Sequence, residues 1–302
     1  MSPLLRDRVH RLPNFLVIGA LKAGTTSLYH YLRSHPQIFM PGVKEIAFFA
    51  KDDVWSKGID WYERQFAQAG SHFLAVGEAS TLYATYPRNS GVPERIATHL
   101  PSARLIYVLR DPIQRIRSHY QHRVAVGAED RPIDQALFAN PIYIDCSRYA
   151  AQIEQYLRYF SREQLLLIAS EDLRSARQAT MMLVYEFLEV DSQYVPPNLD
   201  REYYKTDRRR VHSPKMGSLR NWVKSYFPQS KRAKEWFDLQ GPLARRAVAR
   251  KISTPGLGRL SLMENSVTIP EHISCRLKET LREDVRTLRQ YLNEAPAWTE
   301  DY

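Results

Sequence analysis

Short apolar runs alternate with amphipathic segments along the first two thirds of the chain. Five runs are continuous enough to predict buried strands: 15–18, 38–40, 73–78, 105–109 and 165–169. Most of them are followed by a segment whose apolar residues recur at helical spacing: 26–35, 93–99, 112–124, 147–160 and 176–188. This order predicts an α/β fold, with a parallel sheet flanked by helices on both faces.

The last third of the chain has a different pattern. Residues 189–215 are rich in proline, tyrosine and basic side chains, which predicts a loop, and 225–270 is the least informative stretch. A final amphipathic segment at 274–292 predicts a helical C-terminal part. The length suits one large α/β domain or two small ones, and we expect a single domain over residues 1–302.

Composition narrows the class of protein. The chain is 44% hydrophobic and 25% charged, as is ordinary for a soluble globular protein. No apolar stretch approaches the ~20 residues of a membrane-spanning helix, and the charged N-terminus lacks the apolar core of a secretory signal. We therefore expect a cytoplasmic protein. Its two cysteines form no C-x-x-C pair and no cluster of metal ligands is evident, so no metal is expected.

Positive charge is concentrated in one segment. The formal net charge is +10, and residues 201–251 hold 15 Lys and Arg against 4 Asp and Glu. Solvated helix faces explain such a segment. An anionic cofactor, an anionic acceptor, an anionic membrane surface or a nucleic acid explains it equally well. The charge alone therefore leaves the partner open.

The most informative motif follows the first predicted strand. Gly19 and Gly24 have the spacing of a nucleotide-triphosphate loop, but threonine stands where that loop needs lysine. The lysine comes earlier, in a segment that combines a cation, a glycine and hydroxyls at a helix start: Lys22, Ala23, Gly24, Thr25, Thr26 and Ser27. Such a segment suits a bound phosphate. The missing Lys-Ser/Thr pair argues against Mg-ATP and favours another anionic nucleotide.

A second segment has matching chemistry. The predicted strand 105–109 leads into Arg110-Asp111-Pro112 and a helix that carries Ser118. Together the two segments resemble the sulfotransferases that use 3'-phosphoadenosine 5'-phosphosulfate (PAPS). The resemblance implies that residues 22–27 hold the 5'-phosphosulfate and that Arg110 and Ser118 hold the 3'-phosphate. It also implies a P-loop-like sheet and a role for Lys22 at the leaving oxygen.

Two further segments are similar to the heparan-type and related bacterial members. Lys44-Glu45-Ile46-Ala47-Phe48-Phe49 matches a segment whose glutamate is the general base and whose lysine lies near the active site. Residues 77–83 resemble a Gly-Glu-x-Ser/Thr-Pro-x-Tyr segment, with Thr81 where the family often has proline. Glu78 and Ser80 are expected either to orient the acceptor or the Lys22 region, or to be structural. Because cytosolic small-molecule members use a histidine base, His35 and His119 remain alternatives to Glu45.

The resemblance also covers part of the basic segment. Arg208, Arg209, Arg210 and His212 lie where heparan-type members have a Lys-Gly-Arg-x-His loop around the 3'-phosphate, with arginine in place of lysine and glycine. We therefore expect a PAPS-dependent sulfotransferase with a hydroxylated acceptor, carbohydrate or small molecule, and no nucleic-acid partner. The alternatives are a P-loop nucleotide kinase or NTPase, and a non-enzymatic polyanion-binding protein built on residues 201–251.

Overall fold

A five-stranded parallel sheet forms the centre of the protein. The computed structural model describes residues 11–201, 203 and 267–302, and the sheet has the order β2-β3-β1-β4-β5. The strands are β1 Phe15–Gly19, β2 Ile38–Phe39, β3 Ala75–Ala79, β4 Arg104–Leu109 and β5 Leu165–Ala169. All five predicted strands are confirmed, and β1 and β4 in particular are apolar runs with buried residues on both faces.

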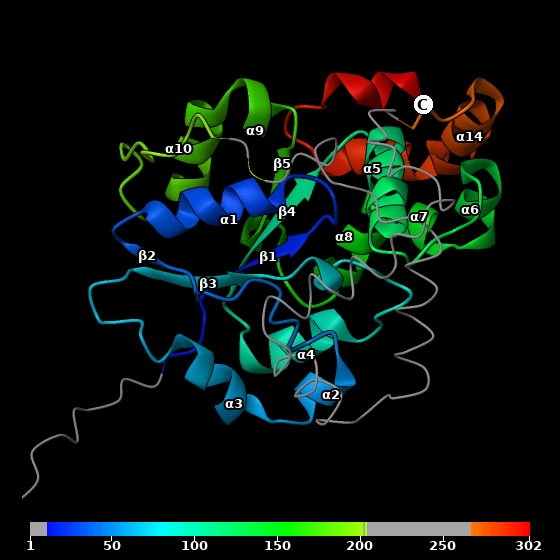
Figure 1. The fold of residues 1–302 in the computed structure, drawn as a ribbon. Coiled ribbons are helices and arrows are strands. Elements are labelled where there is room, and N and C mark those ends of the chain that lie inside the picture. Colours follow the sequence, from blue (N-terminus) through cyan, green and yellow to red (C-terminus); the bar gives the residue numbers. More distant parts are fainter. Residues whose placement is uncertain (1–10, 202, 204–266) are drawn as a thin grey trace, which may run out of the picture.

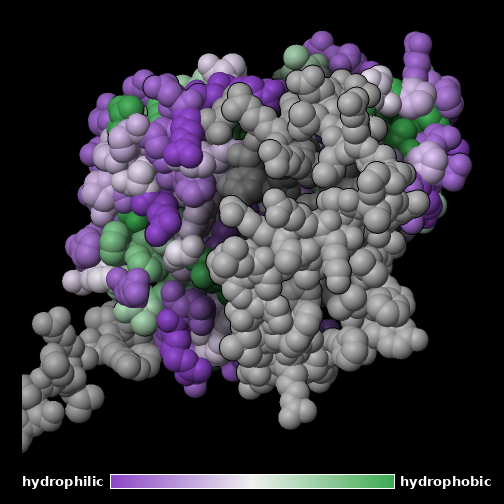
Figure 2. Space-filling view, viewed as in Figure 1, coloured by the Kyte–Doolittle hydropathy of each residue, from purple (hydrophilic) through white to green (hydrophobic). Residues whose placement is uncertain are grey.

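Helices cover both faces of this sheet. The longer ones are α1 Thr25–Ser34, α4 Val92–His99, α5 Pro112–Ala125, α8 Tyr149–Leu157, α10 Arg177–Phe187 and α14 Glu271–Leu288. In Figure 1, α1 and α10 lie on one side of the sheet and α4 lies on the other. The predicted α/β fold is therefore confirmed. The described surface in the same view is mainly hydrophilic (Figure 2).

Several short helices were not predicted. They are α2 Asp52–Trp55, α3 Ile59–Glu63, α6 Ile133–Ala139, α7 Ile142–Asp145 and α9 Asp172–Ser175. Single 3-10 turns lie at Arg64–Phe66, Thr81–Tyr83, Arg162–Gln164, Arg289–Tyr291 and Ala297–Asp301. One or two turns are too short to display a helical period, so the sequence pattern does not reveal them. The described part of the predicted loop, up to residue 201, contains neither helix nor strand.

Two glycines allow close packing around β1. A Cβ atom on Gly77 would lie 2.5 Å from the Phe15 ring, and one on Gly19 would lie 2.8 Å from the Tyr107 ring. A side chain at either position would push the neighbouring strand away. These contacts let the three strands pack closely: Phe15 pairs with Gly77 at the N-terminal end of β1, and Gly19 pairs with Tyr107 at its C-terminal end. The C-terminal edge of a parallel sheet is where ligands bind.

The C-terminal helix α14 closes the domain against α8. Its buried stripe is Ile273, Leu277, Leu281, Val285 and Leu288. Asp284 on the same helix accepts hydrogen bonds from the N–H groups of Ala150 (3.1 Å) and Ala151 (3.0 Å) at the start of α8. Burial raises the pKa of Asp284 to about 6. The predicted helical C-terminal part is confirmed. None of the helices in the described ranges has the length and apolarity needed to cross a membrane.

Candidate active site

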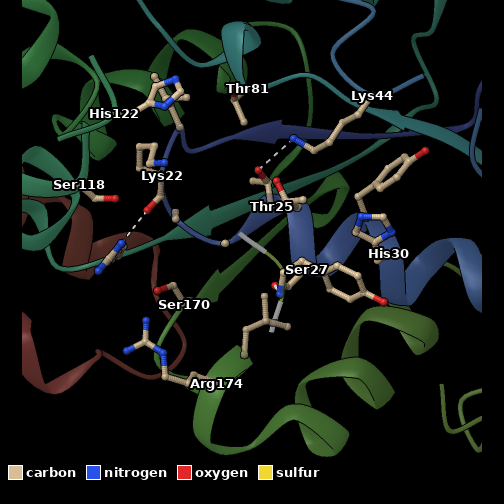
Figure 3. Close-up of a pocket in the computed structure, with 18 of the residues that line it drawn as sticks. Lys22, Thr25, Ser27, His30, Lys44, Thr81, Ser118, His122, Ser170 and Arg174 are labelled. Carbon is tan, nitrogen blue, oxygen red and sulfur yellow. Dashed lines mark hydrogen bonds between the residues drawn. The ribbon is translucent and has the colours of Figure 1, made fainter. Parts of the chain in front are cut away.

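The C-terminal edge of the sheet opens into a cleft with a volume of about 1060 Å³. Its walls come from the loop after β1, the first turns of α1, the segment around Lys44, the loop after β3, one face of α5 and the loop after β5. Figure 3 shows side chains from these elements pointing toward a common space. Segments that are distant in the sequence therefore share one site.

The loop after β1 presents an anion-binding helix start. Gly24 precedes α1 with a φ of 100°, a left-handed conformation that glycine adopts without strain. Among the described residues, no backbone oxygen accepts from the N–H groups of Gly24, Thr25 or Thr26, whereas the N–H of Ser27 bonds the Gly24 oxygen at 3.0 Å. These donors and the positive end of the α1 dipole face the cleft, as a phosphate requires.

Arg110 lies beside this loop at the end of β4. Its Nη1 donates to the main-chain oxygen of Lys22 at 2.9 Å, and its Nη2 is 3.4 Å from Oε1 of Gln114. Its Nε is buried and has no partner in the described part of the chain. Burial, followed by the nearby charge of Arg174, lowers the pKa of Arg110. The Nε–H of Arg110 therefore remains available to a ligand, and a second cation, Arg174, lies nearby.

Further cationic and hydroxyl groups line the same end of the cleft. Besides the predicted Ser118, the structure adds Ser170 after β5 and Arg174 on α9, which Figure 3 labels, and also Arg117 on α5. Sequence reasoning missed these three residues. The position of Ser170 just after a predicted strand was a usable signal. Arg174 lies on a four-residue helix outside any motif, so no local pattern reveals it.

Lys44 and Glu45 lie on the opposite wall. Lys44 Nζ donates to Glu45 Oε1 at 2.6 Å and is 3.4 Å from Thr25 Oγ1. The N–H of Thr81 donates to Glu45 Oε2 at 2.8 Å, and the Thr81 hydroxyl lies 3.2 Å from both carboxylate oxygens. The Glu45 side chain is 37% exposed against 18% for Lys44. The carboxylate is thus accessible from the cleft and held in one orientation.

Glu78 and Ser80 lie behind this wall and do not line the cleft. Glu78 is 1% exposed and Ser80 is fully buried. The Ser80 hydroxyl donates to Glu78 Oε2 at 2.8 Å and accepts the N–H of Ala47 at 2.9 Å. The pair therefore contacts the segment that carries Glu45, which the sequence did not predict.

The two histidines considered as alternative bases are both buried away from the cleft. His35 bonds the main-chain oxygen of Asp191 and the N–H of Gln37. His119 packs beside Arg115, and burial followed by that positive charge lowers its pKa to about 2. His30 and His122 line the cleft instead. Arg208, Arg209, Arg210 and His212 lie outside the described residues.

Comparison with known proteins gives the class of this fold and site. The sulfotransferase domain family matches residues 12–234, so the chain belongs to that family. A solved sulfotransferase from Alicyclobacillus acidocaldarius shares the fold with a TM-score of 0.56 and 28% identity, over 74% of this chain and 98% of that one. The family expected from the motifs is therefore confirmed, and membership supports sulfate transfer as the activity.

The curated relatives include enzymes of heparan sulfate. The mouse bifunctional heparan sulfate N-deacetylase/N-sulfotransferase 4 is 36% identical over 208 residues, which cover 61% of this chain and 23% of that protein. The mouse heparan sulfate glucosamine 3-O-sulfotransferase 5 is 28% identical over 208 residues, 65% of this chain and 58% of that protein. The membrane-associated sulfotransferase kil1 of Dictyostelium discoideum is 41% identical over 115 residues, 37% of this chain and 23% of that protein. The chain thus spans about a quarter of the length of the first of these relatives.

Proposed function

We propose that this protein transfers a sulfuryl group from PAPS to a hydroxyl group of an acceptor. The observation that carries the proposal is the convergence of three segments on one cleft: the Lys22 loop, the Arg110–Ser118 segment and the Lys44-Glu45 pair. Each supplies a function that the transfer needs. In our proposal the Lys22 loop and the Arg110–Ser118 segment each bind one phosphate group, and the Lys44-Glu45 pair supplies a carboxylate across the cleft from them.

The cleft has the donors that PAPS requires. The N–H groups at the start of α1, with the hydroxyls of Thr25, Thr26 and Ser27, suit the 5'-phosphosulfate. The unpartnered Nε of Arg110, with Ser118 and Arg174, suits the 3'-phosphate. Residues 208–210 and 212 join this subsite in our proposal through their resemblance to the family loop. When bound, PAPS supplies the sulfuryl group and a phosphate leaving group.

Glu45 and Lys22 have complementary tasks in the transfer. As the acceptor oxygen bonds to sulfur, the bond between sulfur and the bridging oxygen breaks. Glu45 takes the proton of the acceptor hydroxyl, and Lys44 balances the charge of the carboxylate through its 2.6 Å contact. Lys22 stabilises the negative charge that remains on the leaving oxygen. The chain's part is therefore positioning, proton acceptance and charge stabilisation.

A carbohydrate hydroxyl is the acceptor we favour. The support comes from the names of the heparan sulfate relatives and from the match at Lys44 and Glu45. Small-molecule hydroxyls remain in the acceptor class we propose to screen. A P-loop kinase or NTPase is disfavoured by the family match and by Thr25 in place of the lysine. We further propose that residues 1–302 form one sulfotransferase domain and act in the cytoplasm.

Mass spectrometry tests this proposal. The full chain is incubated with PAPS and a panel of hydroxylated oligosaccharides, glycosides and phenols, and each product mixture is searched for the mass of one added sulfuryl group. The proposal expects a sulfated product in step with release of adenosine 3',5'-bisphosphate. ATP turnover with Mg²⁺ and no PAPS-dependent product would favour the kinase or NTPase instead.

A further inference from the structure

A buried carboxylate lies directly behind Glu45, and no cation among the described residues pairs with it. Glu78, at the end of β3, accepts hydrogen bonds from the hydroxyls of Tyr62 (2.7 Å) and Tyr83 (2.5 Å) at Oε1, and from Ser80 (2.8 Å) at Oε2. Burial raises the pKa of Glu78, the charge of Glu45 adds to that rise, and the hydroxyl donors oppose it. A buried acid of this kind is costly if its only task is to fill the core.

Glu78 determines which way the Ser80 hydroxyl points. A serine hydroxyl has a single proton, and in this structure that proton is donated to Glu78. The Ser80 oxygen is then left as an acceptor, and the N–H of Ala47 donates to it at 2.9 Å. Removal of the Glu78 charge would free the hydroxyl proton to turn toward other acceptors. The bond to Glu78 thus orients the Ser80 oxygen as the acceptor for Ala47.

The segment held in this way has an unusual backbone. Glu45 has a φ of 63° and Ala47 a φ of 54°, left-handed values that non-glycine residues adopt rarely. The end of β3 and the turn after it supply the restraints: Ala79 accepts the N–H of Glu45 at 3.0 Å, and Ser80 accepts the N–H of Ala47. The N–H of Thr81, which a proline would lack, bonds the Glu45 carboxylate at 2.8 Å.

We propose that Glu78, acting through Ser80, is a positioning residue that fixes the strained 45–47 segment and so aims the Glu45 carboxylate into the cleft. The proposal rests on the proposed role of Glu45 as general base. The proposal gives the hydrogen bonds that join Glu78, Ser80 and Ala47 a function beyond core packing. Loss of the Glu78 charge or of the Ser80 hydroxyl should loosen residues 44–50 and misplace Glu45, while the phosphate loop on α1 stays intact.

Hydrogen–deuterium exchange of the full chain tests this inference. The variants are Glu78→Gln, Ser80→Ala and the control Tyr62→Phe, which removes one hydroxyl donor to Glu78 but keeps the ring that stacks on Phe48 at 4.5 Å. Loss of one hydrogen bond is expected to speed exchange of residues 44–50 by about fivefold in Glu78→Gln and Ser80→Ala. Tyr62→Phe should leave that segment unchanged, even if the whole protein unfolds more easily.

Two more measurements separate positioning from a general loss of stability. The double variant E78Q/S80A should exchange no faster at residues 44–50 than Ser80→Ala alone, because Glu78 acts through Ser80. With an acceptor from the screen, Glu78→Gln and Ser80→Ala should lower kcat by roughly tenfold to a hundredfold. The affinity for adenosine 3',5'-bisphosphate should stay within about twofold of that of the unaltered chain.

Equal exchange of residues 44–50 in Glu78→Gln, Ser80→Ala and Tyr62→Phe would overturn the inference. If Glu78→Gln does not fold, Ser80→Ala still decides the matter, because it deletes only one hydroxyl. An active Glu45→Gln enzyme with a loosened segment in Ser80→Ala would reject Glu45 as the base and keep the structural link. An inactive Glu45→Gln enzyme, with Ser80→Ala unchanged in exchange and turnover, would reject the link and keep the base.

Discussion

Arg110 and Lys22 are joined by a hydrogen bond of 2.9 Å that spans 88 positions of sequence, from the guanidinium Nη1 to the main-chain oxygen. The bond links the segment proposed for the 3'-phosphate to the loop proposed for the 5'-phosphosulfate. Lys22 itself has a φ of 73°, so its carbonyl is presented in an unusual direction. The two proposed phosphate subsites therefore depend on each other's geometry.

A first prediction concerns recognition of the 3'-phosphate. The chain should bind adenosine 3',5'-bisphosphate in EDTA far more tightly than AMP, because only the former reaches Arg110 and Ser118. Arg110→Gln should reduce that preference by about tenfold to a hundredfold, as expected for lost hydrogen bonds to a charged group. Calorimetry measures both ligands, with Arg158→Gln, an exposed position outside the cleft lining, as the control. Equal affinity of the unaltered chain for AMP would contradict the assignment.

A second prediction concerns Arg174, which the sequence did not reveal. Its charge already disfavours the charged form of Arg110, so the two cations are close enough to share an anion. Arg174→Gln should weaken the binding of adenosine 3',5'-bisphosphate by about tenfold and leave the affinity for AMP nearly unchanged. The same calorimetric titration checks it. A loss that is equal for both nucleotides would place Arg174 near the 5' end or the base instead.

Lys22→Ala tests the charge on the leaving oxygen. The interaction is stronger in the transition state than in the bound donor, so the rate should suffer more than binding. Turnover at saturating PAPS should fall by ~10²–10³, with a smaller loss of nucleotide affinity. The control is Lys51→Ala, an exposed lysine outside the cleft lining. Near-normal turnover of Lys22→Ala would mean that another group stabilises the charge on the leaving oxygen.

Asp284 predicts a pH dependence of stability. Its pKa is raised to about 6 in the folded chain from the ordinary value of 3.8, chiefly by burial, so the folded state binds the proton more tightly. The contribution of this group to stability therefore falls as the pH rises from about 4 to 6. Asp284→Asn should flatten that part of the curve, because asparagine does not titrate, although its amide nitrogen cannot accept the second backbone N–H bond. Urea unfolding of both proteins between pH 4 and pH 7 measures the difference, and parallel curves would contradict it.

Local sequence patterns predicted the sheet and the turn before α1 well. The run at 15–19 is buried on both faces, and the glycine at position 24 does take the left-handed conformation that a tight turn needs. Such features are visible because they depend on neighbouring residues. The start of α14 was predicted three residues late, at 274 instead of 271, because the pattern from Leu277 onward did not include Ile273, which is buried in the first turn.

Contacts between distant segments were not visible in the sequence. The bond from Ala47 to Ser80 joins residues 33 positions apart, and no periodicity or spacing rule encodes it. The left-handed φ of Glu45 is equally hidden, because glutamate has no preference for that conformation. Arg174 enters the cleft only because α9 follows β5 at the ligand-binding edge of the sheet. Tertiary structure, and not local propensity, determines these positions.

The general base is the centre of the account, and Glu45→Gln is its most direct test. The glutamine keeps the shape of the side chain but cannot take the acceptor's proton, so transfer at saturating PAPS should fall by ~10²–10⁴. Affinity for adenosine 3',5'-bisphosphate should stay nearly unchanged. His30→Ala and His122→Ala, the histidines that line the cleft, belong in the same assay. Sulfated product from Glu45→Gln at the rate of the unaltered enzyme, beside an inactive histidine variant that still binds the nucleotide, would contradict the account.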